Sequence, residues 1–253
     1  MFTAKTKRIE ALVQKFPYIV TDLDPIFGSG SANVYVDYGN VAFWADRLEW
    51  HVDLKRLKQL IDSFSGPSIA KFYYGTRRGI DKSEELIRNA KELGYKVFTK
   101  EVKTIKLSID VSSISEGSPD IVRNLICKPF LKTLSLETIQ HLNEHLRTLN
   151  KNGILSFDDL KCNFDVEIGR DMLVDQAIGQ AEVFALWSCD SDFAGSVEEL
   201  LDDGKKVVVF GMSGMVSREL NLLRKKGLQV YDVRKLKEMI CWPRELAEEL
   251  KAL

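Results

Sequence analysis

The chain has 253 residues, of which 45% are hydrophobic and 29% are charged, and its formal net charge is −1. This near-neutral charge excludes a global positive field, so a polyanionic partner such as a nucleic acid would have to be held by a local patch. The 4 cysteines form no Cys-x-x-Cys pair, which favours reduced thiols in a cytoplasmic protein over a disulfide framework or a zinc site. The sequence shows neither the apolar core of a signal peptide nor an apolar stretch near the ~20 residues of a membrane span.

Residues 1–32 are expected to form a helical extension that ends in a linker. Apolar residues fall at helical spacing from Ile9 to Phe16, and Pro17 ends this run. A Gly- and Ser-rich stretch at 28–31 is typical of a flexible joint.

Between residues 33 and 102, short apolar runs alternate with amphipathic runs. The apolar runs predict strands, and the amphipathic runs between them predict helices. The strands are expected at 34–36, 69–74 and 95–102, and the helices at 53–64 and 82–93. Strands and helices that alternate at these spacings predict a parallel sheet with right-handed crossovers.

The alternation stops between residues 103 and 160 and then resumes. A Ser-rich loop at 108–118 and helices at 120–131 and 136–149 predict an inserted helical subdomain. Further on, strands are expected at 183–187, 206–210 and 228–231, and helices at 164–182, from 196, at 217–226 and from Pro243. We therefore predict a doubly wound, mostly parallel α/β domain at 33–240 with a helical insertion at about 103–160, followed by a C-terminal helix in 241–253.

Acidic residues follow two of the predicted strands. Asp37 ends the first strand, and Asp190 and Asp192 lie in the turn after the apolar strand at 183–187. If the strand order reverses between these two strands, both turns flank one crevice at the carboxyl edge of the sheet. Carboxylate oxygens suit Mg²⁺ or Mn²⁺, although an isolated Asp-x-Asp is more often a helix cap beside a solvated acid.

The helix before the second of these strands carries further acids. Asp165 lies near its first turn, and Asp171 and Asp175 share one face. Carboxylates gathered around an empty crevice repel one another, and a divalent cation relieves that repulsion. We expect Asp37, Asp165 and Asp190 to ligate a metal, and we expect Asp175 and Glu167 to be solvated.

Three segments of the chain together resemble the NYN (LabA-like) family of PIN-like nucleases. They are Val36-Asp-Tyr-Gly-Asn40, Lys161-Cys-Asn-Phe-Asp-Val-Glu-Ile-Gly-Arg-Asp171 and Trp187-Ser-Cys-Asp-Ser-Asp-Phe193. The resemblance covers residues 33–102 and 158–240 and implies a PIN-like fold with metal-dependent cleavage of RNA, in an endonucleolytic reaction. It implies that Asp37, Asp165 and Asp190 hold Mg²⁺ or Mn²⁺, that Asp192 and Asp171 support them, and that Asn40 positions ligands or substrate.

Other residues near the predicted strand ends are candidates for substrate binding. Arg77, Arg78 and Lys161 would hold flanking phosphates as charge-assisted donors, with a solvated loop as the alternative for the two arginines. Ser188, in the same turn as Asp190, completes this group. Tyr73 and Tyr74 could stack a base, although at least one of them is expected in the core. The expected partner is single-stranded RNA, and homodimerisation stays open.

Two alternatives to a nuclease arise from the same sequence. His141-Leu-Asn-Glu-His145 matches the pattern of inverted zincins, with Glu144 as the base, but its leucines are those of an ordinary amphipathic helix. A non-catalytic RNA-binding or regulatory module would share the fold, and the near-neutral charge keeps that reading open. Cys189 also stands where the NYN family commonly has glycine.

Overall fold

The structure is a computed structural model that describes residues 1–28, 30–76, 81–110, 132–149 and 154–251. It divides into two compact units. The first combines Met1–Glu101 with Cys162–Leu253, and the second is Val102–Lys161. The candidate acids all lie in the first unit.

The first unit is built on a parallel sheet of 6 strands in the order β3-β2-β1-β6-β7-β8. Their bounds are β1 Ala32–Asp37, β2 Pro67–Thr76, β3 Lys96–Glu101, β6 Val183–Trp187, β7 Lys206–Gly211 and β8 Gln229–Asp232. The chain builds outward from β1 in one direction and from β6 in the other, so the strand order reverses between these two neighbours. This arrangement confirms the predicted α/β class and fits a doubly wound sheet.

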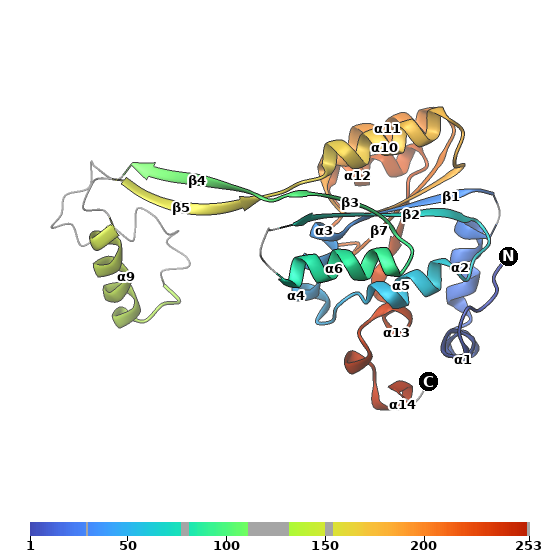
Figure 1. The fold of residues 1–253 in the computed structure, drawn as a ribbon, viewed down its shortest axis with the longest axis horizontal. Coiled ribbons are helices and arrows are strands. Elements are labelled where there is room, and N and C mark those ends of the chain that lie inside the picture. The colour runs from blue at the N-terminus through green and yellow to red at the C-terminus, as the bar shows by residue number, and fades with distance from the viewer. Residues whose placement is uncertain (29, 77–80, 111–131, 150–153, 252–253) are drawn as a thin grey trace. The chain divides into compact units, whose positions relative to one another are not determined.

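Helices cover both faces of this sheet (Figure 1). One face carries α10 Asp165–Ala177, α11 Ala194–Asp202 and α12 Arg218–Leu223, and the other carries α2 Tyr18–Phe27, α5 Leu54–Ile61 and α6 Asp81–Glu92. Strands β1 and β6 are buried along their whole length, as expected for strands covered on both faces. The shorter elements are α1 Lys7–Lys15, α3 Tyr38–Phe43, α4 Ala45–Leu48, α13 Lys237–Ile240 and α14 Glu248–Lys251, with 3₁₀ turns at Ser191–Phe193, Arg224–Lys226, Val233–Leu236 and Pro243–Glu245.

The N-terminal segment is part of the core, where a loosely attached extension was expected. Ile9, Leu12, Ile19 and Leu23 are almost completely buried. Pro17 separates two helices, and the second one, α2, was not predicted. The backbone N–H of Gly66 donates to the carbonyl of Phe27 at 2.8 Å. This hydrogen bond connects the end of α2, just before the expected joint at 28–31, to the residue that precedes β2.

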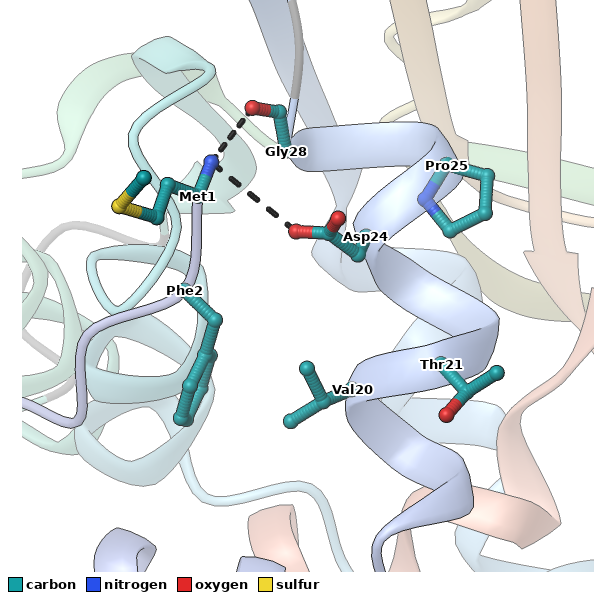
Figure 2. Close-up of a pocket in the computed structure, with 7 residues that line it drawn as sticks. All are labelled: Met1, Phe2, Val20, Thr21, Asp24, Pro25 and Gly28. Atoms are coloured by element: carbon teal, nitrogen blue, oxygen red, sulfur yellow. Dashed lines mark hydrogen bonds and ion pairs between the residues drawn. The ribbon is translucent and has the colours of Figure 1, made fainter.

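The amino group of Met1 contacts the end of α2, near the amino ends of β1 and β2. It donates to the carbonyl of Gly28 at 2.5 Å and lies 3.9 Å from a carboxylate oxygen of Asp24 (Figure 2). A cavity of about 650 Å³ between the first two residues of the chain and α2 is lined by Phe2, Val20 and their neighbours. It lies at the edge of the sheet opposite to the acids.

The second unit differs from the prediction of a helical subdomain. Besides helix α9 (Leu136–Leu149), it contains an antiparallel hairpin of β4 (Lys103–Asp110) and β5 (Ile154–Lys161). The period-two alternation of Ile105, Leu107 and Ile109 is the strand signal that the sequence interpretation overlooked. The expected helix at 120–131 lies outside the described residues.

The C-terminal region also differs from its prediction. Pro243 begins a 3₁₀ turn, and the helix that follows, α14, has only 4 residues. Predicted helix 164–182 ends early, at Ala177, and Gly179 takes a positive φ of 69° just beyond it. Within the described ranges, no helix combines the length and the apolar character that crossing a membrane requires.

Candidate acidic site at the carboxyl edge of the sheet

Carboxylates from three separate segments lie at the carboxyl edge of the sheet. Asp37 is the last residue of β1, and Asp190 follows the end of β6. Because Val36 of β1 pairs with Trp187 of β6, the two turns lie side by side at the point where the strand order reverses. Asp165 joins them as the first residue of α10. We refer to Asp37, Asp165, Asp190 and Asp192 as the acidic edge.

Asp37 is the most enclosed of these acids, with 9% of its surface exposed. Its Oδ1 accepts the backbone N–H of Asn40 at 3.3 Å, and its Oδ2 accepts the hydroxyl of Ser188 at 3.2 Å. Burial, together with the negative charges of Asp165 and Asp190, nevertheless raises the pKa of Asp37 to about 6. Its surroundings therefore make the charged form of this carboxyl costly.

The other acids are more open to solvent. Burial raises the pKa of Asp165, and the charges of Asp190 and Asp192 act in the same direction. Asp190 caps the 3₁₀ turn Ser191–Phe193, because its Oδ1 accepts the backbone N–H of Asp192 at 3.2 Å. Asp192 itself is exposed. The acidic edge is therefore a set of carboxylates that repel one another at close range.

The chemistry of this donor set suits a hard divalent cation, since its potential ligands are carboxylate oxygens. A bound cation would also offset the repulsion that raises the pKa values of Asp37 and Asp165. Within the described part of the chain, however, no three His, Cys, Asp or Glu side chains are gathered closely enough to form a metal-binding group. The acids therefore influence one another electrostatically without forming a closed set of ligands among the described residues.

Ser188 and Asn40 have structural partners at this edge. Ser188 is fully buried, and its hydroxyl donates to Asp37 and accepts the N–H of Asp190 at 3.3 Å. The carbonyl oxygen of the Asn40 side chain accepts Trp44 Nε1–H at 2.9 Å and Cys189 N–H at 3.3 Å. Ser188 is enclosed and contacts two of the acids, and its predicted contact with substrate stays a prediction. Asn40 ties α3 to the turn after β6.

Cys189 is packed as part of the core. A Cβ added at Gly211 in β7 would lie 2.2 Å from its sulfur, so a glycine is needed opposite this side chain. Burial raises the pKa of the Cys189 thiol to about 11. A thiol that stays protonated at neutral pH is a poor nucleophile, so Cys189 is packed as a core residue rather than poised as a reactive thiol.

Asp171 and Asp175 belong to a separate polar network under α10. Asp175, of which 4% is exposed, accepts the hydroxyl of Tyr35 at 2.6 Å and pairs with Lys71 Nζ at 2.7 Å. Asp171 accepts the hydroxyl of Tyr73 at 2.9 Å. We call this set the α10 network: Asn33, Tyr35, Lys71, Tyr73, Asp171 and Asp175.

This network corrects the prediction for Asp175 and shows that Asp171 has partners outside the acidic edge, while the predicted support of a metal by Asp171 stays a prediction. Asp175 is buried and paired, where a solvated residue was expected. Asp171 lies almost two turns along α10 from Asp165, and its hydrogen bonds join it to the network and to Arg170. The available signal was Lys71, because a lysine inside an otherwise apolar strand needs a buried partner.

The residues expected to bind substrate are only partly described. Arg77, Arg78 and the side chain of Lys161 lie outside the described residues. Tyr73 is fully buried and bonded to Asp171, so it is a core residue, and the half-buried Tyr74 packs edge-on against Tyr38.

Sequence reasoning missed Lys100 at the end of β3. Its Nζ lies 2.6 Å from Glu167, which was expected to be solvated without a partner. The charge of Lys100 also favours the charged form of Asp165 and so opposes the rise of its pKa. The positive charge of Lys100 therefore acts on Asp165, one of the residues of the acidic edge.

The histidines of the zincin-like motif lie in the second unit. His141 and His145 are exposed neighbours on α9, with ring centroids 6.5 Å apart. They do not form part of a metal-binding group among the described residues.

Comparison with known proteins informs on the fold alone. No protein-family model matches the chain, and no curated protein matches it. The chain is similar in structure to a protein of unknown function from Vibrio parahaemolyticus, with a TM-score of 0.51 and 16% identity. The similarity covers 84% of this chain and 96% of the other. At this level of identity the match supports a shared fold and carries no function.

Proposed function

We propose that the chain is a metal-dependent ribonuclease of the NYN, PIN-like kind, which hydrolyses phosphodiester bonds of single-stranded RNA at the acidic edge. The observation that carries the proposal is the convergence of Asp37, Asp165 and Asp190 from three separate segments on the switch point of the sheet. Burial and mutual repulsion raise the pKa values of the first two, which is typical of acids arranged for function rather than for stability.

Each acid would contribute according to its surroundings. Mg²⁺ or Mn²⁺, when bound, supplies the positive charge that activates water and stabilises charge developing on the phosphate. Asp37 is held in one orientation by Ser188 and by the N–H of Asn40, which suits a fixed ligand. Asp190 is held by its own turn. Asp165 starts α10, so its carboxylate position follows the packing of that helix.

The remaining groups suit roles outside the ligand set. Asp192 is exposed beside Asp190, where it can orient water without being enclosed. Lys100 is placed to balance the negative charge near Asp165 and to meet a phosphate that displaces Glu167. Arg77, Arg78 and Lys161 are proposed to hold flanking phosphates. In the proposed reaction water attacks the phosphodiester directly, so no protein nucleophile is required.

The test is to incubate the protein with end-labelled single-stranded RNA and DNA in Mn²⁺, Mg²⁺ or EDTA. We expect metal-dependent cleavage of the RNA that Asp190→Asn reduces by at least about 100-fold, since the substitution removes a charged ligand. Asp62→Asn is the matched control, because Asp62 is an exposed acid at the end of α5. It should leave cleavage unchanged.

Circular dichroism and binding of the labelled RNA complete the test. A folded wild-type protein that binds RNA but does not cleave it with either Mn²⁺ or Mg²⁺ would support the non-catalytic RNA-binding module instead. Cleavage that survives Asp190→Asn would show that the acidic edge is not the active site.

A further inference from the structure

Two large apolar side chains are exposed next to the acidic edge. Val166 is 81% exposed and Phe43 is 76% exposed, and among the described residues only Met1 has a comparable value in the first unit. Val166 adjoins Asp165 in sequence, and Phe43 lies in the helix that starts directly after Asp37. Single exposed apolar residues are ordinary, but here the two most exposed large apolar residues of the first unit outside the N-terminus belong to the short helix that Asp37 caps and to the first turn of the helix that Asp165 starts.

In helix α3, Phe43 lies on the same side as Gly39, whose Cβ position adjoins the carboxylate of Asp37. Asp37 caps this helix, and a Cβ added at Gly39 would lie 3.5 Å from Asp37 Oδ1. Residues four apart share one face of a helix, so Phe43 lies one turn, about 5.4 Å, beyond Gly39 on that face. The opposite side of α3 is the one that packs, through Tyr38 against Phe72 and through the buried Trp44.

We propose that Phe43 is a stacking platform for an unpaired base next to the phosphodiester bond that is cut. This inference rests on the proposed nuclease function and names the feature that selects single strands. A base exposes its flat face only when it is not stacked within a duplex, and aromatic side chains bind such faces without regard to sequence. Phe43 lies about one helical turn beyond Gly39, which adjoins Asp37, so a base stacked on Phe43 would lie on the same side of α3 as this acid.

A second copy of the chain is a poor occupant for this surface. Symmetric association there would bring Asp165, Asp190 and Asp192 of one protomer towards the same acids of the other, and like charges at an interface are costly. A nucleic acid would avoid this penalty in the proposed reaction, because the divalent cation that cleavage would require would offset the charge of the carboxylates.

The experiment compares Phe43→Leu, Phe43→Trp and a control on single-stranded and duplex RNA. Phe43→Leu keeps an apolar side chain without a ring, and Phe43→Trp keeps a ring. Tyr18→Leu is the control, since Tyr18 is an aromatic residue of α2 that is 40% exposed and lies outside the acidic edge. Two readouts are taken: steady-state kinetics of cleavage, and fluorescence of an RNA that carries one 2-aminopurine.

We expect Phe43→Leu to lower kcat/KM on single-stranded RNA by about 10- to 100-fold, mostly through KM, as loss of one stacked base predicts. Phe43→Trp should retain activity, and Tyr18→Leu should match the wild type. Binding should quench 2-aminopurine in the wild type and not in Phe43→Leu. The preference for single strands over duplex should shrink in Phe43→Leu.

The outcomes separate this inference from the proposed function. An active wild type whose kinetics and 2-aminopurine signal are unchanged by Phe43→Leu overturns the platform and leaves the nuclease standing. An inactive wild type overturns the nuclease, and the quenching readout still decides whether Phe43 stacks a base. A change from dimer to monomer in Phe43→Leu, without any change in quenching, would show that a second copy covers this surface and would also overturn the platform.

Discussion

At the scale of single residues, Asp37 shows how position sets the chemistry of a carboxyl group. Burial and two neighbouring acids raise its pKa to about 6, against an ordinary value of 3.8, while hydrogen bonds from Ser188 and the N–H of Asn40 partly oppose the shift. In the absence of metal, the folded protein therefore holds a proton on Asp37 that the unfolded chain has already released between these two pH values.

This shift predicts a pH-dependent gain in stability for Asp37→Asn in EDTA. The wild type loses the contribution of this group as pH rises from about 4 to about 6, and the loss is complete above that range. Asn carries no charge, so the variant should be more stable than the wild type at pH 7 by about 3 kcal/mol, and the difference should vanish near pH 4. Urea denaturation at both pH values measures it.

Asp62→Asn serves as the control for this measurement, because it removes an exposed acid. Added Mn²⁺ should reduce the advantage of Asp37→Asn, since the cation binds the charged carboxylates. A difference that stays constant from pH 4 to pH 7 would contradict the environment described for Asp37.

At the scale of secondary-structure elements, the α10 network determines where helix α10 lies. Asp175 on the helix pairs with Lys71 of β2 and accepts hydrogen bonds from Tyr35 and Asn33 of β1. Each of these groups is buried, so each depends on the others for its hydrogen bonds. The helix that carries Asp165 to the acidic edge is thus held by buried polar contacts as well as by its buried apolar residues Ile168 and Met172.

Lys71→Met should therefore destabilise the protein by about 3–5 kcal/mol, because it leaves the charge of Asp175 buried without its partner. Combining it with Asp175→Asn should recover a large part of this loss, since the pair is then neutral and Tyr35 keeps an acceptor. Urea denaturation of the two single variants and the double variant measures the coupling.

Lys55→Met is the matched control for this substitution, because Lys55 is exposed on α5. It should change the free energy of unfolding by less than about 0.5 kcal/mol. Strictly additive effects in the double variant would show that Lys71 and Asp175 do not interact.

At the scale of the whole molecule, the two units differ in how they are built. The first unit contains the sheet, the acidic edge and the α10 network, and two segments of chain contribute to it. The chain enters the second unit through β4 and leaves it through β5. At the base of this hairpin Lys103 pairs directly with Lys161. Directly paired residues in antiparallel strands lie about 5 Å apart, so the chain enters and leaves the second unit at nearly the same point.

Replacing residues 104–160 by a two-residue Asn-Gly turn should leave the first unit folded. The remaining chain keeps every strand of the parallel sheet, and a tight turn spans paired antiparallel residues without strain. We expect one cooperative unfolding transition in urea and a circular dichroism spectrum of an α/β protein. A gradual transition, or binding of a dye for exposed apolar surface, would show that the first unit depends on the second.

The sequence by itself determined the class of the fold and the positions of Asp37 and Asp190. Apolar runs covered on both faces, separated by amphipathic helices, are a local signal, because burial of each element depends on its own pattern. The carboxyl ends of parallel strands meet at one edge, so acids that follow β1 and β6 were expected together, and the reversal of strand order between these strands confirms that geometry.

Only the tertiary structure decided which polar residues are enclosed and with whom. Ser188 and Asp171 resemble candidate site residues in sequence and Asp175 resembles a solvated acid, but their surroundings depend on partners that lie far away in the chain, namely Asp37, Tyr73 and Lys71. The same holds for Phe43, whose exposure depends on how α3 packs against the sheet and is not indicated by the sequence around it. Hydrogen bonds and exposure of this kind arise between segments, and a local pattern does not contain them.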